Sequence, residues 1–290
     1  MHPIAGYYIN LDRSPDRAAF MQEQLARLGL HGMQRHVAID GAQSALPPGC
    51  TLLPGEYACF LSHLRVLEQA PPESVTLVLE DDVELSPHLP ELLSGIVQAA
   101  APAFDIALLE CQPHFSLADV SRLWDVASRH FVGVTRRIGG VDLMDAQRHY
   151  KWGMIAYVVP PAARRRVLEV LHRAMANGPI LPIDRCLEQA FTTQALRGAI
   201  TVPFLATPSL RWHGRSTISN DRLPQNPLTV LRRLLYAGGF GDIEELTRSF
   251  AGAPADPALR LFGLVLRELA AYQRAVAQLP PQPPPAGDGS

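Results

Sequence analysis

The feature that most constrains this chain is an apolar run that ends in three acidic residues. Residues 75–79 read Val-Thr-Leu-Val-Leu, a pattern rich in β-branched and apolar side chains that is typical of a buried strand. Glu80, Asp81 and Asp82 follow directly. Because open α/β sheets bind their ligands at the carboxyl ends of the strands, we expect these three carboxyl groups to lie at a binding edge.

The acidic residues alone are weak evidence for function. With 28 acidic residues among 290, about 3 tripeptides with an acid at both ends are expected by chance. The preceding strand supplies the specificity. Oxygen ligands suit magnesium or manganese, and two carboxylates leave coordination positions free for a diphosphate. A solvated acidic turn after a strand is the alternative interpretation.

Composition excludes several classes of protein. A hydrophobic content of 47% and a mean hydropathy of +0.04 indicate a globular chain with a substantial core. The net charge of −2 leaves no basic excess for nucleic acid. No apolar run approaches the ~20 residues of a membrane span. The N-terminus lacks signal-peptide features, and the four cysteines lack zinc or redox spacing, so we expect a cytoplasmic protein with reduced thiols.

Strand and helix patterns alternate along the first two thirds of the chain. Expected strands cover residues 5–11, 34–39, 75–79, 104–109, 152–159 and 199–206. Expected helices cover residues 15–28, 54–67, 89–97, 161–175 and 183–197. This alternation predicts an α/β fold with a mostly parallel sheet flanked by helices.

Two other regions depart from the alternation. Residues 112–150 are polar and irregular, which is typical of a functional loop such as a lid or an acceptor loop. Helical patterns return at 228–236, 243–250 and 257–279, and a Pro-rich tail follows.

Five blocks of sequence, in order, resemble those of glycosyltransferase family 25. They are Tyr-Ile-Asn-Leu-Asp-Arg-Ser-Pro-Asp-Arg at 8–17, Gly-Glu-Tyr-Ala-Cys-Phe-Leu-Ser-His at 55–63, Leu-Glu-Asp-Asp-Val at 79–83, Gly-Met-Ile-Ala-Tyr at 153–157 and Pro-Ile-Asp at 182–184. The resemblance covers roughly residues 4–220. That family includes bacterial lipopolysaccharide galactosyltransferases and the related collagen galactosyltransferases.

The resemblance implies a GT-A type, Rossmann-like fold over residues 1–225. We expect a C-terminal helical extension over 226–279 and a disordered tail over 280–290. The implied reaction is transfer of a hexose, commonly galactose, from a UDP-sugar to a hydroxyl group with inversion, usually with Mn²⁺ or Mg²⁺.

The resemblance also implies roles for particular residues. Glu80 and Asp82 occupy the outer positions of a DxD-like motif, and His213 is the candidate for a third metal contact. Inversion requires a base that takes the acceptor proton. Asp184 matches the Pro-x-Asp block, although an ordinary helix cap explains it equally well, and Glu110 is the rival base.

The nucleotide-sugar site is expected in the loops after the first two strands and in the matched blocks. Its candidate residues are Asn10, Asp12, Arg13, Arg17, Asp40, Gly41, Ser62, His63, Asp81 and Gly153.

The expected protein is therefore a cytoplasmic glycosyltransferase that extends lipopolysaccharide or another surface glycan. Its expected partners are a UDP-sugar donor and a glycan or glycolipid acceptor, with peripheral contact at the inner membrane surface. Two alternatives stay open at this point. One is a metal-dependent phosphohydrolase of UDP-sugars, and the other is a non-catalytic relative that binds a nucleotide sugar or a glycan.

Overall fold

A seven-stranded sheet with the order β2-β1-β3-β9-β5-β10-β8 organises the described part of the chain. The computed structural model describes residues 2–100, 103–112, 117–132, 137–176, 178–212 and 232–239, which all fall within one unit. The strands are β1 (Ile4–Asn10), β2 (Met33–Val37), β3 (Val75–Glu80), β5 (Ile106–Leu108), β8 (Asp142–Asp145), β9 (Ala156–Val159) and β10 (Gly198–Val202). Only β8 and β9 of these strands run against the other five. The expected α/β fold with a mostly parallel sheet is confirmed.

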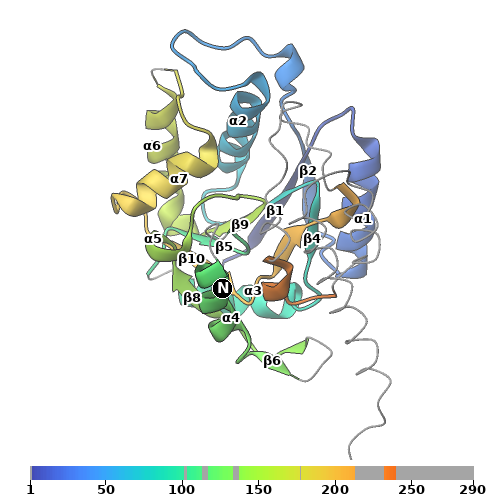
Figure 1. Cartoon of the computed structure of the whole chain (residues 1–290). Helices are drawn as coiled ribbons and strands as arrows, with labels where there is room; N and C mark the ends of the chain where they lie inside the picture. Colours follow the sequence, from blue (N-terminus) through green and yellow to red (C-terminus); the bar gives the residue numbers. More distant parts are fainter. Residues whose placement is uncertain are drawn as a thin grey trace, which may run out of the picture. The chain divides into compact units, whose positions relative to one another are not determined.

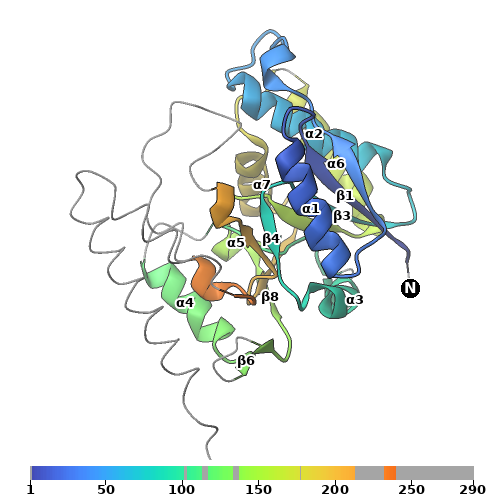
Figure 2. The same ribbon diagram turned by 90° about the vertical axis from the view of Figure 1, so that its right-hand side faces the viewer.

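Helices cover both faces of this sheet. On one face, α1 (Pro15–Arg27) and α3 (Leu89–Ala100) pack in a cluster that includes Leu77 and Leu79 of β3. On the other face, α2 (Pro54–Gln69), α6 (Pro161–Met175) and α7 (Ile183–Thr192) pack in a cluster that includes Val78. Figure 1 shows α2, α6 and α7 on one side of the sheet, and Figure 2 shows α1 running along β1 and β3.

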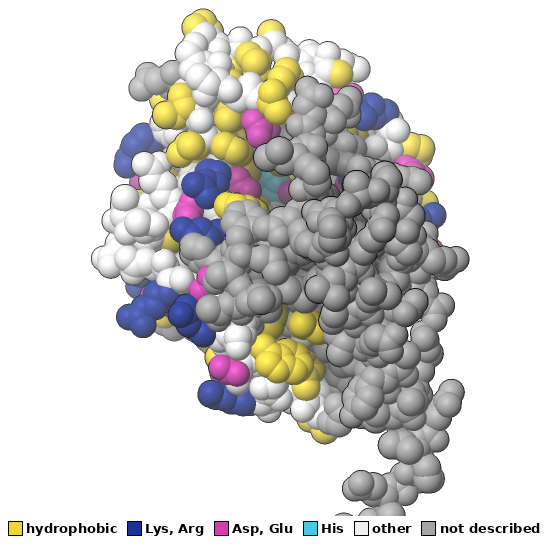
Figure 3. Space-filling view, viewed as in Figure 1, with side chains coloured by type: hydrophobic (Ala, Val, Ile, Leu, Met, Phe, Trp, Pro, Cys, Tyr) yellow, Lys and Arg dark blue, Asp and Glu magenta, His cyan; other side chains and the backbone are white. Residues whose placement is uncertain are grey.

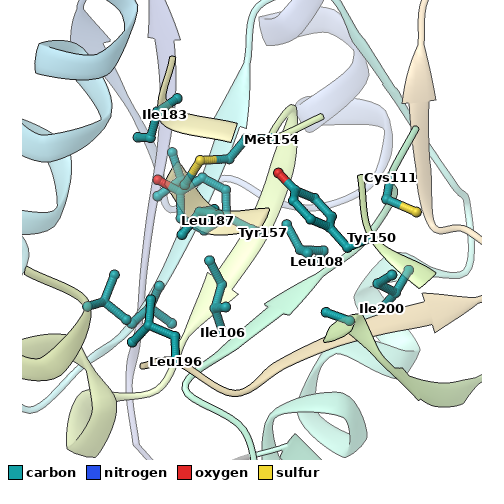
Figure 4. Close-up of a cluster of buried hydrophobic side chains, with 14 of the residues drawn as sticks. Ile106, Leu108, Cys111, Tyr150, Met154, Tyr157, Ile183, Leu187, Leu196 and Ile200 are labelled. Atoms are coloured by element: carbon teal, nitrogen blue, oxygen red, sulfur yellow. The ribbon is translucent and has the colours of Figure 1, made fainter. Parts of the chain in front are cut away.

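The core follows from the two-residue period of the strands. Val75 to Leu79 are all buried because successive side chains of β3 enter opposite helical layers. Beside β3, the antiparallel strand β9 contributes Tyr157, which lies among Ile106, Leu108 and Leu187 in the cluster drawn in Figure 4. Tyr157 is therefore a core residue.

The five expected helices are confirmed, with one change of length. Prolines stand at the starts of α1, α2 and α6, where a missing N–H costs no intrahelical bond. The helix expected to reach residue 197 ends at Thr192, and Gln194 adopts a positive φ of 58° two residues later. The strand expected over 199–206 divides at Pro203 into β10 and β11 (Ala206–Pro208), which pairs with β4 (Val83–Leu85).

The prediction that residues 112–150 are irregular is wrong for most of that range. The structure contains α4 (Leu117–Ala127), β6 (Phe131–Val132), β7 (Arg137–Ile138), β8 and α5 (Ala146–His149). Strand β8 lies at the edge of the sheet and pairs only with β10 among the described strands. An edge strand has a hydrogen-bonded neighbour on one side only and often carries polar side chains. The sequence of β8, Asp-Leu-Met-Asp, therefore lacks the apolar pattern that predicts a buried strand.

Little of the C-terminal region is described. A short 3₁₀ turn, Arg232–Leu235, lies where the sequence predicts a helix over 228–236. Tyr236 pairs with Phe204, and the Ala237 carbonyl accepts a hydrogen bond from Ser86. The expected helices over 243–250 and 257–279 and the tail lie outside the described residues, so the boundary after residue 225 stays a prediction. No helix in the described ranges has the length and apolar character of a membrane span.

One buried side chain fixes the strand that follows the acidic turn. Gln24 of α1 is 3% exposed, and its amide donates to the Val83 carbonyl at 2.9 Å and accepts from the Leu85 N–H at 2.7 Å. The side chain thus bonds the backbone of β4 as a neighbouring strand would. It ties α1 to the residues just beyond Asp82.

We predict that Gln24→Met lowers the free energy of unfolding by about 2 kcal/mol or more, because two buried backbone groups of β4 lose their partner. Urea denaturation checks this value. Glu23→Met is the control on the exposed side of α1 and should change stability by less than about 0.5 kcal/mol. Equal effects of the two substitutions would contradict the assigned role of Gln24.

Candidate active site

The three acidic residues stand at the carboxyl end of β3, as the sequence predicts. Glu80 is the last residue of the strand, and Asp81 and Asp82 form the turn into β4. They border an open pocket between the loops after β1 and β2 and the helix α2. Its lining includes Arg13, Arg17, Gly41, Cys59, Ser62, His63, Glu80, Asp81 and Asp82. Figure 3 shows acidic side chains and a histidine gathered on this face of the molecule.

The central acid is held by the fold itself. Asp81 accepts from Arg17 Nη1 at 2.9 Å through one oxygen and from Asn10 Nδ2 at 2.7 Å through the other. Arg17 also lies 3.2 Å from Asp82 and stacks 5.3 Å from the ring centroid of Trp212. Both oxygens of Asp81 are thus engaged within the protein, and its expected contact with the donor sugar stays a prediction.

The outer acids of the turn, Glu80 and Asp82, make fewer hydrogen bonds than Asp81 among the described residues. Within the described part of the chain, the recorded contacts of Glu80 and Asp82 use one oxygen each, toward His63 and Arg17. Their side chains are 26% and 28% exposed. Burial and the charge of Glu80 raise the pKa of Asp82 to about 7, because three carboxyl groups crowd one turn. Oxygen donors in this state suit a divalent cation such as Mn²⁺ or Mg²⁺.

His63 connects the helix α2 to this turn. Its ring is 1% exposed, with Nδ1 3.1 Å from Tyr157 Oη and Nε2 3.3 Å from Glu80 Oε1. Cys59 stands one helical turn earlier, and ligand atoms of Cys59, His63 and Glu80 all lie within 4.8 Å of one another. Cys59 is not among the residues predicted from the sequence, because no cysteine forms a CxxC pair and the four-residue step from Cys59 to His63 is a weak signal by itself.

The loops after β1 and β2 are joined by ion pairs. Arg13 Nε bonds Asp40 Oδ2 at 2.8 Å, which lowers the pKa of Asp40. Arg35 bonds Asp12 at 2.7 Å and also bonds Asn10 at 2.8 Å. These contacts bring four of the expected donor-site residues to one edge of the sheet.

Gly41 and Ser62 explain how closely this edge packs. A Cβ at Gly41 would stand 2.6 Å from the Pro54 carbonyl oxygen, so the loop approaches the start of α2 as only glycine allows. The Ser62 hydroxyl donates to the Ala58 carbonyl and accepts from the Ile39 N–H. Its hydroxyl thus links α2 to the loop after β2.

Asp184 and Gly153 lie together on the other side. Asp184 is in the first turn of α7, where Oδ1 accepts from the Arg185 N–H at 2.8 Å and Oδ2 accepts from Gly153 N–H at 3.4 Å. The residue that caps this helix is Pro182, so Asp184 is not its N-cap. Burial, followed by the charge of Glu80, raises the pKa of Asp184.

Glu110, the rival base, is fully buried after β5. Its Oε1 pairs with Arg232 Nη1 at 2.7 Å, and no described group bonds its Oε2. A Cβ at Gly153, whose φ is +98°, would stand 3.4 Å from that oxygen. Burial raises the pKa of Glu110, and Arg232 acts in the opposite direction. Arg232 is a site residue that sequence reasoning missed.

His213 lies outside the described residues, so its expected metal contact is a prediction still. Of the other expected residues, Arg13, Arg17, Gly41, Ser62, His63, Glu80, Asp81 and Asp82 line the pocket, and Gly153, Asp184 and Glu110 form a second group. Asn10, Asp12 and Asp40 do not line the pocket but bond Asp81, Arg35 and Arg13 beside it.

Comparison with protein families gives one match. The family model for glycosyltransferase family 25 (LPS biosynthesis protein) matches residues 4–187. Comparison with curated proteins gives no significant match. The matched range contains β3, the acidic turn, Gly153 and Asp184, and it ends before Arg232.

We predict that Asp82 makes the metal-free protein less stable as pH rises. The pKa of Asp82 is about 7 in the folded state against 3.8 ordinarily, so between these values its folded form binds more protons than its unfolded form. The contribution of Asp82 to the unfolding free energy must then fall with rising pH, whereas the lowered pKa values of His36 and His149 act in the opposite direction. We expect the Tm of the unmodified chain to fall relative to that of Asp82→Asn from about pH 5 to about pH 8, which appears as a difference in slope.

The control for this measurement is Glu73→Gln, which changes an exposed carboxylate away from the site and should leave the slope unchanged. A slope in Asp82→Asn equal to that of the unmodified chain would show that Asp82 does not titrate in this range.

Proposed function

The chain belongs to glycosyltransferase family 25, and from this premise we propose that it transfers a hexose from a UDP-sugar to a hydroxyl group of a lipopolysaccharide or related glycan. The family indicates a glycosyltransferase of lipopolysaccharide biosynthesis. Our proposal adds galactose as the first candidate sugar, a Mn²⁺ or Mg²⁺ requirement, inversion at the anomeric carbon and a GT-A type fold.

One observation carries the proposal. The acidic end of β3 and the polar loops after β1 and β2 line the same pocket at the carboxyl edge of the sheet. A nucleoside diphosphate needs both kinds of group in one place. Its base and ribose contact polar loops, and its phosphates need positive charge, which a cation held by the acidic residues would supply. Arg13 and Arg17 line that pocket and are suited to contact phosphate oxygens.

The leaving group determines what the acidic turn must do. When the sugar leaves UDP, negative charge grows on a phosphate oxygen, and a divalent cation held by Glu80 and Asp82 would supply the compensating positive charge. Glu80 and Asp82 fit this role because, among the residues that the structure describes, the hydrogen bonds of each carboxylate use only one of its two oxygens. His213 remains our candidate for a third contact.

On the acceptor side we assign the base to Asp184. Its raised pKa suits a group that must accept a proton, and the Gly153 N–H holds its carboxylate. As the acceptor oxygen attacks the anomeric carbon, Asp184 takes the hydroxyl proton while the bond from that carbon to the UDP oxygen breaks. Glu110 is a poorer candidate because it is fully buried and already paired with Arg232.

The proposed location follows from the substrate class. A UDP-sugar and a lipid-linked acceptor would meet at the inner face of a membrane, so we propose a cytoplasmic protein with peripheral membrane contact.

We predict metal-dependent turnover with a UDP-sugar and a lipopolysaccharide-type acceptor. A panel of UDP-sugars is assayed with Mn²⁺ and with EDTA, and UDP release and glycan product are both measured. Asp82→Asn should lower kcat about 100-fold or more, because it weakens the hold on the cation whose positive charge would offset the charge growing on the leaving group. Hydrolysis that an acceptor does not increase would indicate a phosphohydrolase, and tight UDP binding without turnover would indicate a binding protein.

We further predict that Asp184→Asn lowers kcat about 100-fold or more, the usual range for loss of a general base. The folded fraction is checked by circular dichroism. Glu110→Gln is the matched comparison: it should lower Tm because Arg232 loses its charged partner, while kcat changes by less than about tenfold. Near-normal activity of Asp184→Asn, with loss in Glu110→Gln, would move the base to Glu110.

A further inference from the structure

A second group of metal-ligand side chains lies beside the acidic turn, with a different chemistry. Cys59 and His63 are four residues apart on α2 and therefore share one face of the helix. That face meets Glu80 at the end of β3, and one ligand atom from each of the three residues lies within 4.8 Å of the others. We propose that Cys59, His63 and Glu80 form a binding site for Zn²⁺.

The separation of His63 and Glu80 fits a tetrahedral zinc ion. Zinc binds imidazole nitrogen and carboxylate oxygen at about 2.0–2.2 Å, so a tetrahedral ion separates two such ligands by about 3.3–3.6 Å. His63 Nε2 and Glu80 Oε1 are 3.3 Å apart. The Cys59 sulfur supplies the third ligand, and a water molecule or a substrate oxygen can complete the tetrahedron.

The histidine also has the support that metal-bound imidazoles require. A ligand histidine usually bonds a second group through its other ring nitrogen, which fixes the tautomer and the ring orientation. His63 Nδ1 lies 3.1 Å from the hydroxyl of Tyr157, a fully buried residue of β9. With Nε2 on the metal, Nδ1–H donates to Tyr157 Oη.

Access and ligand type favour zinc over the harder cations. Cys59, His63 and Glu80 all line the open pocket, so an ion can enter from solvent. Sulfur and imidazole select zinc, whereas Mg²⁺ and Mn²⁺ prefer oxygen. On binding, the Cys59 thiol releases its proton to water and bonds the metal as thiolate.

This site goes beyond the proposed transfer reaction, yet it shares Glu80 with it. Zinc would use Glu80 Oε1, the oxygen beside His63, and the second oxygen of the same carboxylate would stay available to the cation proposed for the acidic turn. The zinc site therefore adjoins the proposed donor site through one shared side chain.

The test uses the full-length, metal-free protein and needs no sugar transfer. Titration with ZnCl₂ against a chromophoric chelator should give one tight site, and Cys59→Ser should weaken it about tenfold or more. Cys50→Ser, which changes a thiol outside the three-residue group, should bind zinc like the unmodified chain. Equal zinc affinity in Cys59→Ser and the unmodified chain would overturn the proposal.

A spectroscopic readout keeps the proposal testable if Cys59→Ser does not fold. Co²⁺ added to the unmodified protein should produce a thiolate-to-cobalt charge-transfer band in the near ultraviolet, and Zn²⁺ should abolish it. Cys50→Ser should retain the band. Its absence from the folded, unmodified protein would overturn the site, whatever the transferase assay shows.

Discussion

The rest of the site depends on how Arg17 offsets the repulsion among carboxylates at the end of β3. Glu80, Asp81 and Asp82 are consecutive, and the charge of Glu80 contributes to the raised pKa of Asp82. Arg17 pairs with both aspartates from a nearly buried position on α1. Buried charges are costly unless they are paired. The Arg17 guanidinium therefore allows consecutive acidic residues to lie at the carboxyl end of a buried strand. The same charge lies beside the pocket where phosphate would bind.

A second arginine does for the acid after β5 what Arg17 does for those after β3. Glu110 ends up buried after β5, and Arg232 reaches it from 122 residues away. Arg232 lies beyond the family-matched range, which ends at residue 187. The residues after Arg232 are bonded to Phe204, which precedes β11, and to Ser86, which follows β4. The position of Arg232 therefore depends on these two strands. The site therefore draws on a part of the chain that the matched family region does not include.

Local patterns predicted a large share of the fold. Prolines at helix starts and regular apolar spacing were sufficient for α1, α2 and α6, and the strand β3 with its acidic end was evident from nine residues. Long-range pairing was not predictable in the same way. Nothing local indicates that β9 inserts between β3 and β5, that the polar strand β8 joins β10, or that Arg232 meets Glu110. These contacts depend on which partner a segment finds, a property that no single window of sequence contains.

The alternation of β3 also directs the first two of its three acids toward different helices. Leu77 and Leu79 face the layer of α1, whereas Val78 faces the layer of α2. Successive side chains of a strand point to opposite faces of the sheet, so Glu80 should face α2 and Asp81 should face α1. The observed partners agree: His63 of α2 lies by Glu80, and Arg17 of α1 bonds Asp81. The middle acid thus fastens the turn to α1, and Asp82, which follows the end of the strand, also pairs with Arg17 of that helix.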